Sequence, residues 1–393
     1  MKTNNFYDVI IVGGGVVGLT LASALSDGAL QLAIIDKTFS DGPGAGSSDL
    51  RISAITPATQ FIFERLGVWQ HLPVEKISGF EKMHVWTPEG NYIDFANSEI
   101  GVPYLGYIIE NNLLQRALHQ QLITRSNIHF IPASLQTIQL IEDHVEVCAD
   151  EQQFNAPLLI GADGANSLVR QLAQMELTQQ SYEHTSIVAT VTTELPHQKT
   201  AWQCFLPNGP LAFLPLADPH TSSIVWSTTP AEAEQLLQKN AEDFSSALAQ
   251  AFHYRLGSIQ KTSERLNFSL QRRHVKHYVK PHIALVGDAA HTIHPLAGQG
   301  LNLGILDADC LANIVLTAKK QNHKIGSYVN LRKYERARKA DNTLMFNVVD
   351  NIKQLFGSSF APVKLLRNTG LNLVNNLEFV KRFLIKQAIG ARD

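Results

Sequence analysis

The sequence predicts an α/β fold, with a helix-covered parallel sheet, an antiparallel-sheet (α+β) insertion and a helical C-terminus. Three observations support this prediction. Residues 7–35 read as strand, helix and strand, the opening of a parallel sheet. Residues 181–270 change to short strand-like runs separated by Pro, Gly and Asn, which is typical of an antiparallel sheet. From Ile325 onward the pattern is helical almost to the end.

The composition is that of a globular protein large enough for two domains. The chain has 393 residues, of which 45% are hydrophobic and 17% are charged. Its net charge of −2 creates no overall field that would favour nucleic acid as a partner. Between residues 332 and 393, however, twelve Lys/Arg accompany five Asp/Glu, an excess of +7, so the rest of the chain carries −9.

The first half of the chain supplies most of the elements of the parallel sheet. Tyr7–Val12 and Leu32–Ile35 are short apolar runs expected to be buried strands, and Val16–Leu25 between them is expected to be a helix. Asp41–Ser48 is rich in Gly and Ser and is expected to be a loop. Further on we expect helices at Thr56–Leu66 and Asn111–Arg125, a hairpin of Met83–Trp86 and Tyr92–Phe95, and strands at Ile128–Pro132 and Leu158–Ile160.

The second half contains the insertion and a return to the parallel sheet. Expected elements are strands at Ile187–Thr193, Trp202–Leu206, Leu211–Leu214, Ser223–Thr228 and Ile283–Val286, and helices at Ala231–Phe252 and Gly300–Lys319. We therefore divide the chain into a nucleotide-binding domain of residues 1–75, 98–178 and 273–330, and a substrate domain of residues 76–97 and 179–272. Residues 331–393 form a C-terminal helical region.

The uncharged stretch Val9–Ser26 resembles a membrane span or a signal peptide, and both interpretations are rejected. It contains four glycines and barely reaches spanning length. Asp8 lies where a signal peptide needs positive charge. We expect no other run to be long and apolar enough to span. Three scattered cysteines, an odd number, indicate a reducing compartment without a disulfide framework.

A nucleotide-binding motif follows the first predicted strand. Gly13–Gly18 fits G-x-G-x-x-G, in which Gly13 allows a tight turn, Gly15 lets a pyrophosphate approach, and Gly18 lets helix and strand pack closely. The free N–H groups of the helix N-terminus favour an anion. Asp36 ends the next strand, where a carboxylate would hold a ribose hydroxyl. The alternatives are a glycine turn without a ligand and an aspartate that only caps a loop.

A second glycine-rich segment decides which dinucleotide binds. Gly287 and Asp288 leave the predicted strand Ile283–Val286, where a carboxylate can hold a sugar-like polyol. Gly298–Gly304 then opens another helix. A nicotinamide enzyme needs no second anion site, whereas reduced flavin carries negative charge that backbone N–H groups near Gln299 and Gly300 would stabilise. The two segments together predict FAD.

The second segment also carries a specific resemblance. His294–Asp307 reads H-P-L-A-G-Q-G-L-N-L-G-I-L-D and resembles the signature of the ubiquinone-biosynthesis flavin hydroxylases, the UbiH/UbiF/UbiI (VisC) group of the para-hydroxybenzoate hydroxylase-like class A flavin monooxygenases. Gly161–Arg170 is similar to the group's D-G motif, which FAD shares with a transient nicotinamide cofactor. The resemblance continues through Gly209–Trp226 and Leu365–Gly390, so it covers nearly the whole chain. It implies a Rossmann-like FAD-binding domain with an inserted substrate sheet.

The resemblance implies a set of cofactor-binding residues. Arg51 matches an arginine that contacts FAD, although it could be a surface residue. Asn111 replaces the Arg or Gln that relatives often have, and a helix N-cap explains it equally well. The implied FAD-binding set is Gly13, Gly15, Gly18, Asp36, Arg51, Asn111, Asp163, Gly287, Asp288, Gly298, Gln299, Gly300 and Asn302.

Two residues are candidates for a catalytic role. Pro295 would lie against the flavin and shape the oxygen pocket, although a proline that starts a helix is also consistent. His291 and His294 have H-x-x-H spacing but no nearby Cys, Asp or Glu to complete a ligand set, so no metal is expected. For His291 the alternative to catalysis is a buried structural histidine.

The group's chemistry is aromatic hydroxylation. NAD(P)H would reduce FAD, and O2 would then form a flavin C4a-hydroperoxide that hydroxylates a polyprenyl phenol. Ala212–Trp226 and the tail are closest to the UbiI/VisC branch, which acts at ring carbon C5, whereas Ala340–Asn342 resembles the UbiF branch. Another ring position, a reductase without oxygenation and a low-activity scaffold subunit of a quinone-synthesis complex are the alternatives. Two roles are possible for Phe205, Phe213 and Trp226: they line a substrate pocket, or they pack in the core of the sheet.

The implied partners are the polyprenyl phenol and O2, with no nucleic acid. A cytoplasmic location is expected. The basic C-terminal region is either a solvated helical surface or a peripheral contact with an anionic inner membrane. A quinone-biosynthesis complex and a homo-oligomer are both compatible with the sequence.

Overall fold

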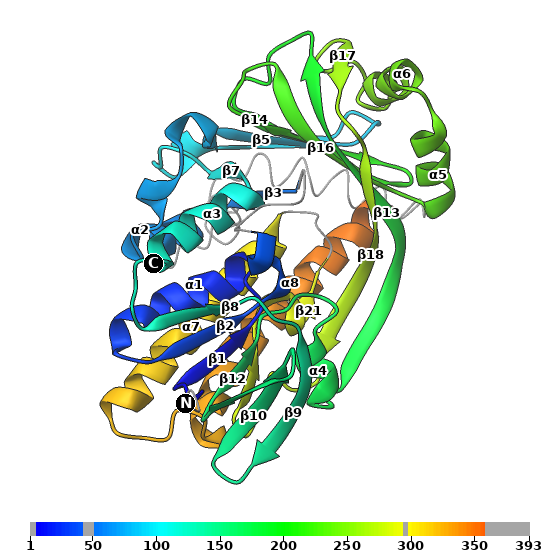
Figure 1. The fold of residues 1–393 in the computed structure, drawn as a ribbon. Coiled ribbons are helices and arrows are strands. Elements are labelled where there is room, and N and C mark those ends of the chain that lie inside the picture. Colours follow the sequence, from blue (N-terminus) through cyan, green and yellow to red (C-terminus); the bar gives the residue numbers. More distant parts are fainter. Residues whose placement is uncertain (1–4, 42–50, 294–297, 358–393) are drawn as a thin grey trace.

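The computed structural model describes residues 5–41, 51–293 and 298–357 (Figure 1). Three predictions fall wholly or partly outside these residues. They concern the loop after Asp41, the His294–Ala297 segment that contains Pro295, and the tail beyond residue 357.

A six-stranded, mostly parallel sheet forms the first layer, in the order β19-β20-β12-β1-β2-β8. The central strand β1 is fully buried because both faces are covered, which explains its unbroken apolar sequence. It begins at Val9, two residues later than predicted; the other predicted strands lie close to their predicted positions, and β19 was not predicted. The bounds are β1 Val9–Val12, β2 Leu32–Ile35, β8 Ile128–Ile131, β12 Leu159–Gly161, β19 Val279–Lys280 and β20 Ile283–Leu285.

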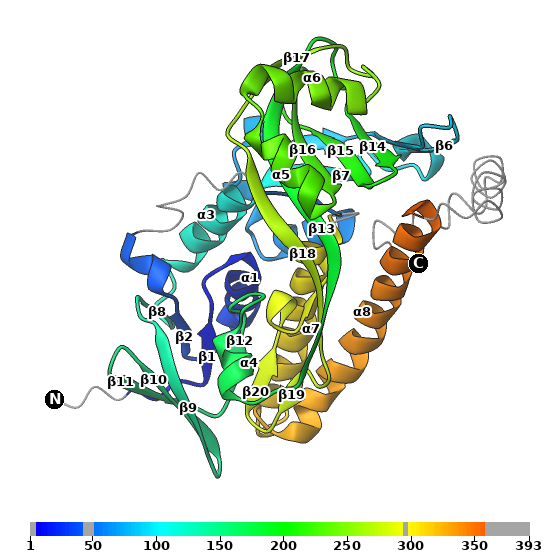
Figure 2. The same ribbon diagram turned by 90° about the vertical axis from the view of Figure 1, so that its right-hand side faces the viewer.

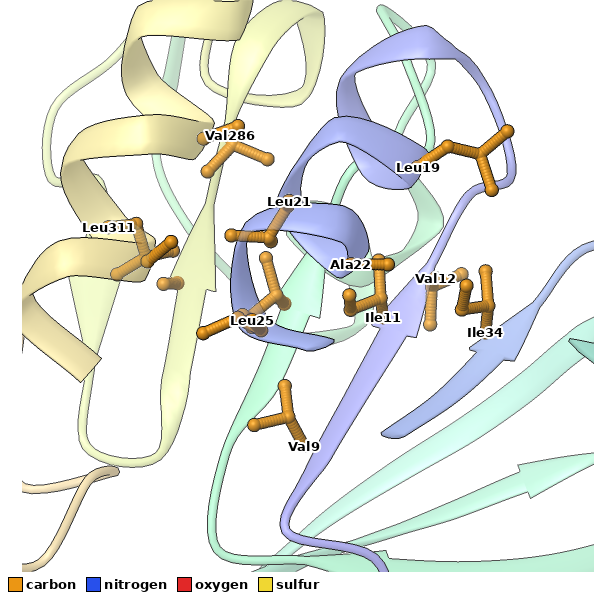
Figure 3. Packing of buried hydrophobic residues seen from close by; sticks show 14 of the residues in the cluster. Val9, Ile11, Val12, Leu19, Leu21, Ala22, Leu25, Ile34, Val286 and Leu311 are labelled. Atoms are coloured by element: carbon orange, nitrogen blue, oxygen red, sulfur yellow. The ribbon is translucent and has the colours of Figure 1, made fainter. Parts of the chain in front are cut away.

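Helices α1 (Val16–Leu25), α3 (Asn111–Leu122), α7 (Gln299–Lys320) and α8 (Tyr328–Gly357) pack around this sheet. Figure 3 shows Leu21 and Leu25 of α1 between Ile11 of β1 and Leu311 of α7. All four side chains are completely buried and belong to one hydrophobic core. Apolar burial of this extent is the main stabilising contribution to the layer.

Helix α7 corrects one expectation about membranes. Among the described residues it is the single helix long and apolar enough to cross a bilayer, so the prediction that no run outside Val9–Ser26 could span is wrong. However, 56% of its most apolar stretch is buried inside the protein. It packs between α1 and α8, and we therefore interpret it as a core helix.

Two three-stranded sheets were not predicted. The first has the order β11-β10-β9 and the second the order β3-β7-β4. Their strands are short or strongly polar on one face, so their hydrophobic period is weak. Their bounds are β3 Ile52–Ile55, β4 Ser78–Phe80, β7 Gly106–Glu110, β9 Leu135–Ile141, β10 His144–Ala149 and β11 Gln152–Ala156. Nearby helices are α2 (Pro57–Arg65), capped by the side chain of Thr56, and α4 (Leu168–Leu172).

A nine-stranded sheet lies mostly at the other end of the molecule, in the order β21-β18-β13-β16-β15-β14-β5-β6, with β17 paired to β13 (Figures 1 and 2). The predicted hairpin is confirmed as β5 and β6, and β5 joins β14 in parallel. The bounds are β5 Lys82–Trp86, β6 Tyr92–Ala96, β13 Leu177–Thr193, β14 Thr200–Leu206, β15 Gly209–Pro215, β16 Thr221–Thr228, β17 Ile259–Thr262, β18 Leu266–Val275 and β21 His291–Thr292.

The predicted helix Ala231–Phe252 is two helices, α5 (Pro230–Gln238) and α6 (Ala241–Ala251). Lys239 is extended, and the Asn240 side chain accepts a hydrogen bond from the N–H of Asp243 at 2.8 Å. An asparagine in this position is a helix N-cap, so α6 begins anew.

The strands β13 and β18 are long and run from the region of the parallel sheet into the nine-stranded sheet (Figure 2). Their pairing shifts register between Ser181 and Thr185. The residues between these two positions on β13 are therefore not paired with β18.

Candidate active site

The β1–α1 turn has the features of a pyrophosphate site. A Cβ atom on Gly18 would lie 2.0 Å from the carbonyl oxygen of Gly13, so only glycine permits this approach of helix and turn. Gly15 is exposed, and a Cβ atom there would have nothing within 4 Å. Because Gly15 is the N-cap of α1 and provides no side-chain cap, the first N–H groups of α1 are available to an anion.

Asp36 organises this turn. Its Oδ2 accepts a hydrogen bond from the N–H of Gly14 at 2.6 Å. Its Oδ1 accepts bonds from the N–H and the hydroxyl of Thr38 at 2.9 and 2.8 Å, so the loop-capping alternative is realised. Gln115 of α3 donates to the Gly14 carbonyl at 2.8 Å from the other side. Hydrogen bonds within the protein therefore hold the shape of this turn, and the ribose contact of Asp36 stays a prediction.

Arg51 and Asn111 are backbone neighbours, since the N–H of Asn111 donates to the Arg51 carbonyl at 3.0 Å. Arg51 is exposed. Asn111 Oδ1 accepts the Ser53 hydroxyl at 2.6 Å. The N-cap alternative for Asn111 is wrong, because Glu110 is the extended residue that precedes α3 and Asn111 is already helical.

Asp163 of the D-G motif has one bonded and one unbonded carboxylate oxygen. Oδ2 accepts the N–H groups of Leu168 and Val169 at 2.6 and 3.1 Å. Oδ1 is buried without a hydrogen-bond partner among the described residues. Burial raises the pKa of Asp163 even though these hydrogen bonds oppose the shift. A buried acceptor without a donor is costly, so Oδ1 fits a ligand hydroxyl.

The Gly287–Ala289 turn brings a second carboxylate close. Asp288 is exposed, and Arg51 and Arg273 lie near enough to interact with its charge. Arg170, buried at 4% exposure, donates to the carbonyls of Ala289 and Ala165 at 3.0 and 2.9 Å. Arg170 thus joins the D-G and G-D segments. Its role could not be predicted from its place in the D-G motif, because its hydrogen-bond acceptors are backbone carbonyls.

The first turn of α7 is anchored to β3. Gly298 has φ +59°, a left-handed conformation that favours glycine. A Cβ atom on Gly300 would have nothing within 4 Å. Asn302 donates to the carbonyls of Ala54 and Gly298 at 2.7 and 2.9 Å and accepts the Thr56 N–H at 3.0 Å. Its amide is therefore occupied by backbone, whereas Gln299 and Gly300 are partly exposed at the helix start.

His291 is 1% exposed, and its Nε2 lies 2.5 Å from Asp307 Oδ2. Asp307 also accepts a hydrogen bond from Arg338 at 2.8 Å. This geometry agrees with a buried structural histidine. The other catalytic candidate, Pro295, lies outside the described residues, as does His294.

The three motifs meet because their strands are neighbours. Val12 of β1 pairs with Gly161 of β12, and Gly161 pairs with Leu285 of β20, all in parallel. The turns that follow these three strands therefore lie side by side at the carboxyl ends of the strands (Figure 2 labels all three). Ligands of open α/β sheets bind beyond the carboxyl ends of the strands.

The aromatic residues of the nine-stranded sheet separate onto its two faces. Phe213 and Trp226 are buried with Phe244 and Phe252 in the core beneath α5 and α6. Sheet-core packing therefore explains both. Phe205 belongs to a different cluster on the opposite face.

Comparison with known proteins agrees with this geometry. Residues 6–343 match the FAD binding domain family. The chain is 36% identical over 392 residues to the 3-demethoxyubiquinol 3-hydroxylase of Escherichia coli K12, covering 99% of this chain and 100% of the relative. It is 34% identical to the ubiquinone hydroxylase UbiL of Rhodospirillum rubrum, covering 98% and 89%.

Among solved structures, the p-nitrophenol 4-monooxygenase PnpA of Pseudomonas putida DLL-E4 superposes over 100% of both chains. The TM-score is 0.81 at 17% identity, so this likeness concerns the fold. The match to the FAD binding domain family confirms the prediction of FAD as cofactor. The chain therefore belongs to the FAD-dependent monooxygenases, in the group of ubiquinone-biosynthesis hydroxylases.

Proposed function

We propose that this enzyme hydroxylates the aromatic ring of a polyprenyl phenol or quinol in ubiquinone biosynthesis, with NAD(P)H as reductant and O2 as oxygen donor. The observation that carries the proposal is the meeting of the β1, β12 and β20 turns at the carboxyl ends of these strands. This arrangement brings the three motifs proposed to bind FAD to one place, and two relatives are named as a 3-demethoxyubiquinol 3-hydroxylase and a ubiquinone hydroxylase.

Each turn has a proposed task in binding FAD. The open space at Gly15 and the N-terminus of α1 would accept the pyrophosphate, and Asp36 the adenosine ribose. The unbonded Oδ1 of Asp163 and the exposed carboxylate of Asp288 would accept ligand hydroxyls. When bound, FAD supplies the hydride acceptor and the oxygen-activating centre. The protein's own residues orient it and exclude water.

The N-terminus of α7 has a proposed electrostatic task. Backbone N–H groups near Gln299 and Gly300 are oriented by the helix start and would stabilise negative charge on the reduced flavin ring. Asn302 would hold this helix start in place through its three backbone bonds. Pro295 keeps its proposed place against the flavin. His291 is proposed to act through Asp307, because its burial leaves no surface for a ligand.

Two ring positions are the candidates. Ala212–Trp226 and the tail Leu365–Gly390 favour C5, the position predicted from the sequence, whereas Ala340–Asn342 resembles the UbiF branch. The Escherichia coli relative, 36% identical over 392 residues, is named for hydroxylation at position 3 of 3-demethoxyubiquinol. We propose the latter position, because this likeness covers the entire chain.

Complementation of bacterial strains that each lack one ubiquinone hydroxylase tests this assignment. The gene should restore ubiquinone in the strain that accumulates demethoxyubiquinone, with mass spectrometry identifying the intermediate that disappears. Rescue of the C5 strain alone would move the assignment to C5. Rescue of no strain would contradict a role in ubiquinone biosynthesis.

The alternative of a scaffold subunit is tested with Asp288→Ala. If FAD serves catalysis, the amount of ubiquinone restored by the variant should fall in proportion to the FAD that it has lost. A variant that lacks FAD and still restores normal ubiquinone would establish the scaffold role. The matched control is Glu234→Ala, which removes an exposed acidic side chain from α5.

A cytoplasmic location at the inner-membrane surface remains part of the proposal. It is supported by the lipid-like substrate proposed here and by exposed cations on α8 such as Lys333 and Arg336. Flotation with anionic vesicles, compared with neutral vesicles, tests it.

A further inference from the structure

One face of the C-terminal helix α8 contacts the two parts of the chain proposed above to bind FAD, residues 287–293 and the first turns of α7. These two parts are called the flavin-binding segment below. Arg338, Asn342, Phe346 and Asp350 are spaced by four and so lie on one side of the helix. Exposure is 4%, 0% and 1% for the first three residues, and 16% for the side chain of Asp350. Leu344, on another side of α8, is 63% exposed.

The lower part of this face binds Asp307 of α7. Arg338 Nε and Asn342 Nδ2 donate to Asp307 Oδ1 at 2.8 and 3.2 Å. The other oxygen, Oδ2, receives His291 at 2.5 Å and the N–H of Gly287 at 3.3 Å. A single carboxylate therefore joins α8 to both ends of the segment that follows β20.

The charges in this contact are compatible with full burial. Burial by itself would raise the pKa of Asp307 and lower that of Arg338. The proximity of His291 and Arg338 outweighs burial and lowers the pKa of Asp307. The carboxylate likewise keeps the pKa of Arg338 above its usual value. Both groups are ionised and hold each other in place.

Phe346, in the middle of the face, contacts one residue just after β21 and another in the first turns of α7. Phe346 packs on Ile293, which follows β21, and on Leu303 of α7. Its ring lies 4.8 Å from that of His274 on β18. Removal of this ring would leave the end of β21 and the start of α7 without their common packing partner.

The upper end of the face is bonded to the two long strands. Asp350 accepts hydrogen bonds from Tyr182 at 3.0 Å and from Arg272 of β18 at 2.5 Å. Tyr182 lies where the pairing of β13 with β18 is interrupted between Ser181 and Thr185. Both strands continue from this point into the nine-stranded sheet.

We propose that Arg338, Asn342, Phe346 and Asp350 are positioning residues that fix the flavin-binding segment relative to the nine-stranded sheet. In the proposed function, on which this inference rests, the segment presents FAD and the sheet presents the substrate. Helix α8 is bonded to both, so it sets the separation of the reacting atoms. Errors of about 1 Å in such a separation can reduce a rate by about 100-fold.

The consequence can be measured as the fraction of NAD(P)H electrons that end in hydroxylated product and the fraction that end in hydrogen peroxide. In the coupled reaction, one NAD(P)H, one H+ and one O2 convert the substrate to hydroxylated product and one water. In the uncoupled reaction, the same reactants without substrate turnover give NAD(P)+ and one H2O2. A loosened α8 should move the reaction from the first outcome to the second, with NAD(P)H oxidation largely retained.

The test compares Phe346→Ala and Asp350→Ala with the exposed control Leu344→Ala, all as FAD-loaded full-length enzymes. We expect product formed per NAD(P)H to fall about tenfold in Phe346→Ala, to fall less in Asp350→Ala, and to be unchanged in the control. Phe346→Leu, which restores most of the packing volume, should recover part of the coupling.

A second readout does not need the substrate. The visible absorption spectrum and the reduction potential of bound FAD should change in Phe346→Ala, because the start of α7 moves relative to the flavin ring. If wild-type enzyme fails to hydroxylate the demethoxyubiquinol, the proposed function fails, and the spectrum and potential still decide the positioning role.

The inference is overturned if both test variants melt at lower temperature but keep the wild-type spectrum, potential and product ratio. That result would mean that α8 only stabilises the fold. Should Phe346→Ala not accumulate as folded protein, Asp350→Ala alone decides, because its side chain is partly exposed and its loss removes no core packing.

Discussion

The substitution Gly15→Ala separates ligand binding from folding at the β1–α1 turn. A methyl group at Gly15 would meet no described protein atom within 4 Å, and the backbone there is extended, with φ −74°. Alanine is a poorer N-cap than glycine but loses less entropy on folding, and both effects are below about 1 kcal/mol. We expect the free energy of unfolding of the apoprotein to change by less than about 1 kcal/mol.

FAD binding should respond strongly to the same methyl group. It would occupy the space where the pyrophosphate approaches the α1 N-terminus, so we expect at least a tenfold rise in Kd, or about 1.4 kcal/mol. The matched control is Gly18→Ala, whose Cβ atom would lie 2.0 Å from the Gly13 carbonyl oxygen and 3.2 Å from Ala162 Cβ. Overpacking of this kind costs about 1–3 kcal/mol, so this control should lose both stability and FAD.

The assay is titration of each apoprotein with FAD, followed by fluorescence, together with urea unfolding without FAD. Wild-type FAD affinity in Gly15→Ala would refute the placement of the pyrophosphate at this turn. An apoprotein destabilised as much as Gly18→Ala would refute the description of the space at Gly15 as open.

Three further predictions concern the surroundings of the site. Arg338→Met removes the charged partner of the buried Asp307 carboxylate and should lower the free energy of unfolding by about 3–5 kcal/mol in urea denaturation; a loss below about 1 kcal/mol would contradict the buried ion pair. Asn302→Ala removes three hydrogen bonds to backbone and should cost about 1–3 kcal/mol and weaken FAD binding, measured by the same titration, whereas unchanged affinity would contradict its role in anchoring α7. Burial lowers the pKa of His274 from 6.5 to about 4, so between these values the unfolded chain binds a proton that the folded protein does not, and stability should fall as the pH drops from 6.5 towards 4. The slope of melting temperature against pH should be smaller in His274→Gln, and an equal slope would contradict this assignment.

The parallel layer could be predicted because its sequence signals are local. An unbroken apolar run such as Val9–Val12, followed by glycines, has few alternatives to a buried strand before a helix. The short sheets β3-β7-β4 and β11-β10-β9 could not be predicted in the same way. Strand β9 is mostly exposed, so its sequence has no alternation of apolar residues that would predict a strand. It is a strand because it pairs with β10.

The motifs of the site could also be found in the sequence, but the contacts that support them could not. The bond from Arg170 to the Ala289 carbonyl joins residues 119 positions apart. The pair Asp307–Arg338 likewise requires α7 and α8 to be packed together. For Asn111 the residue type was misleading. Asparagine favours N-caps, but β7 runs directly into α3, so Glu110 is the N-cap and Asn111 is the first residue of the helix.

The order of the parallel strands has a consequence for the protein's synthesis. Strand β12 pairs with β1 through one edge, and its other edge is completed only by β20, which follows more than a hundred residues later. During translation the ribosome therefore releases β1, β2 and β12 well before their last partner, and an unpaired edge in a nascent chain invites aggregation. With the FAD contacts proposed above, cofactor loading is also a late event, since the turn after β20 and the first turn of α7 have to emerge first. Low cellular yield of C-terminally truncated forms would be an expected result of this order of synthesis.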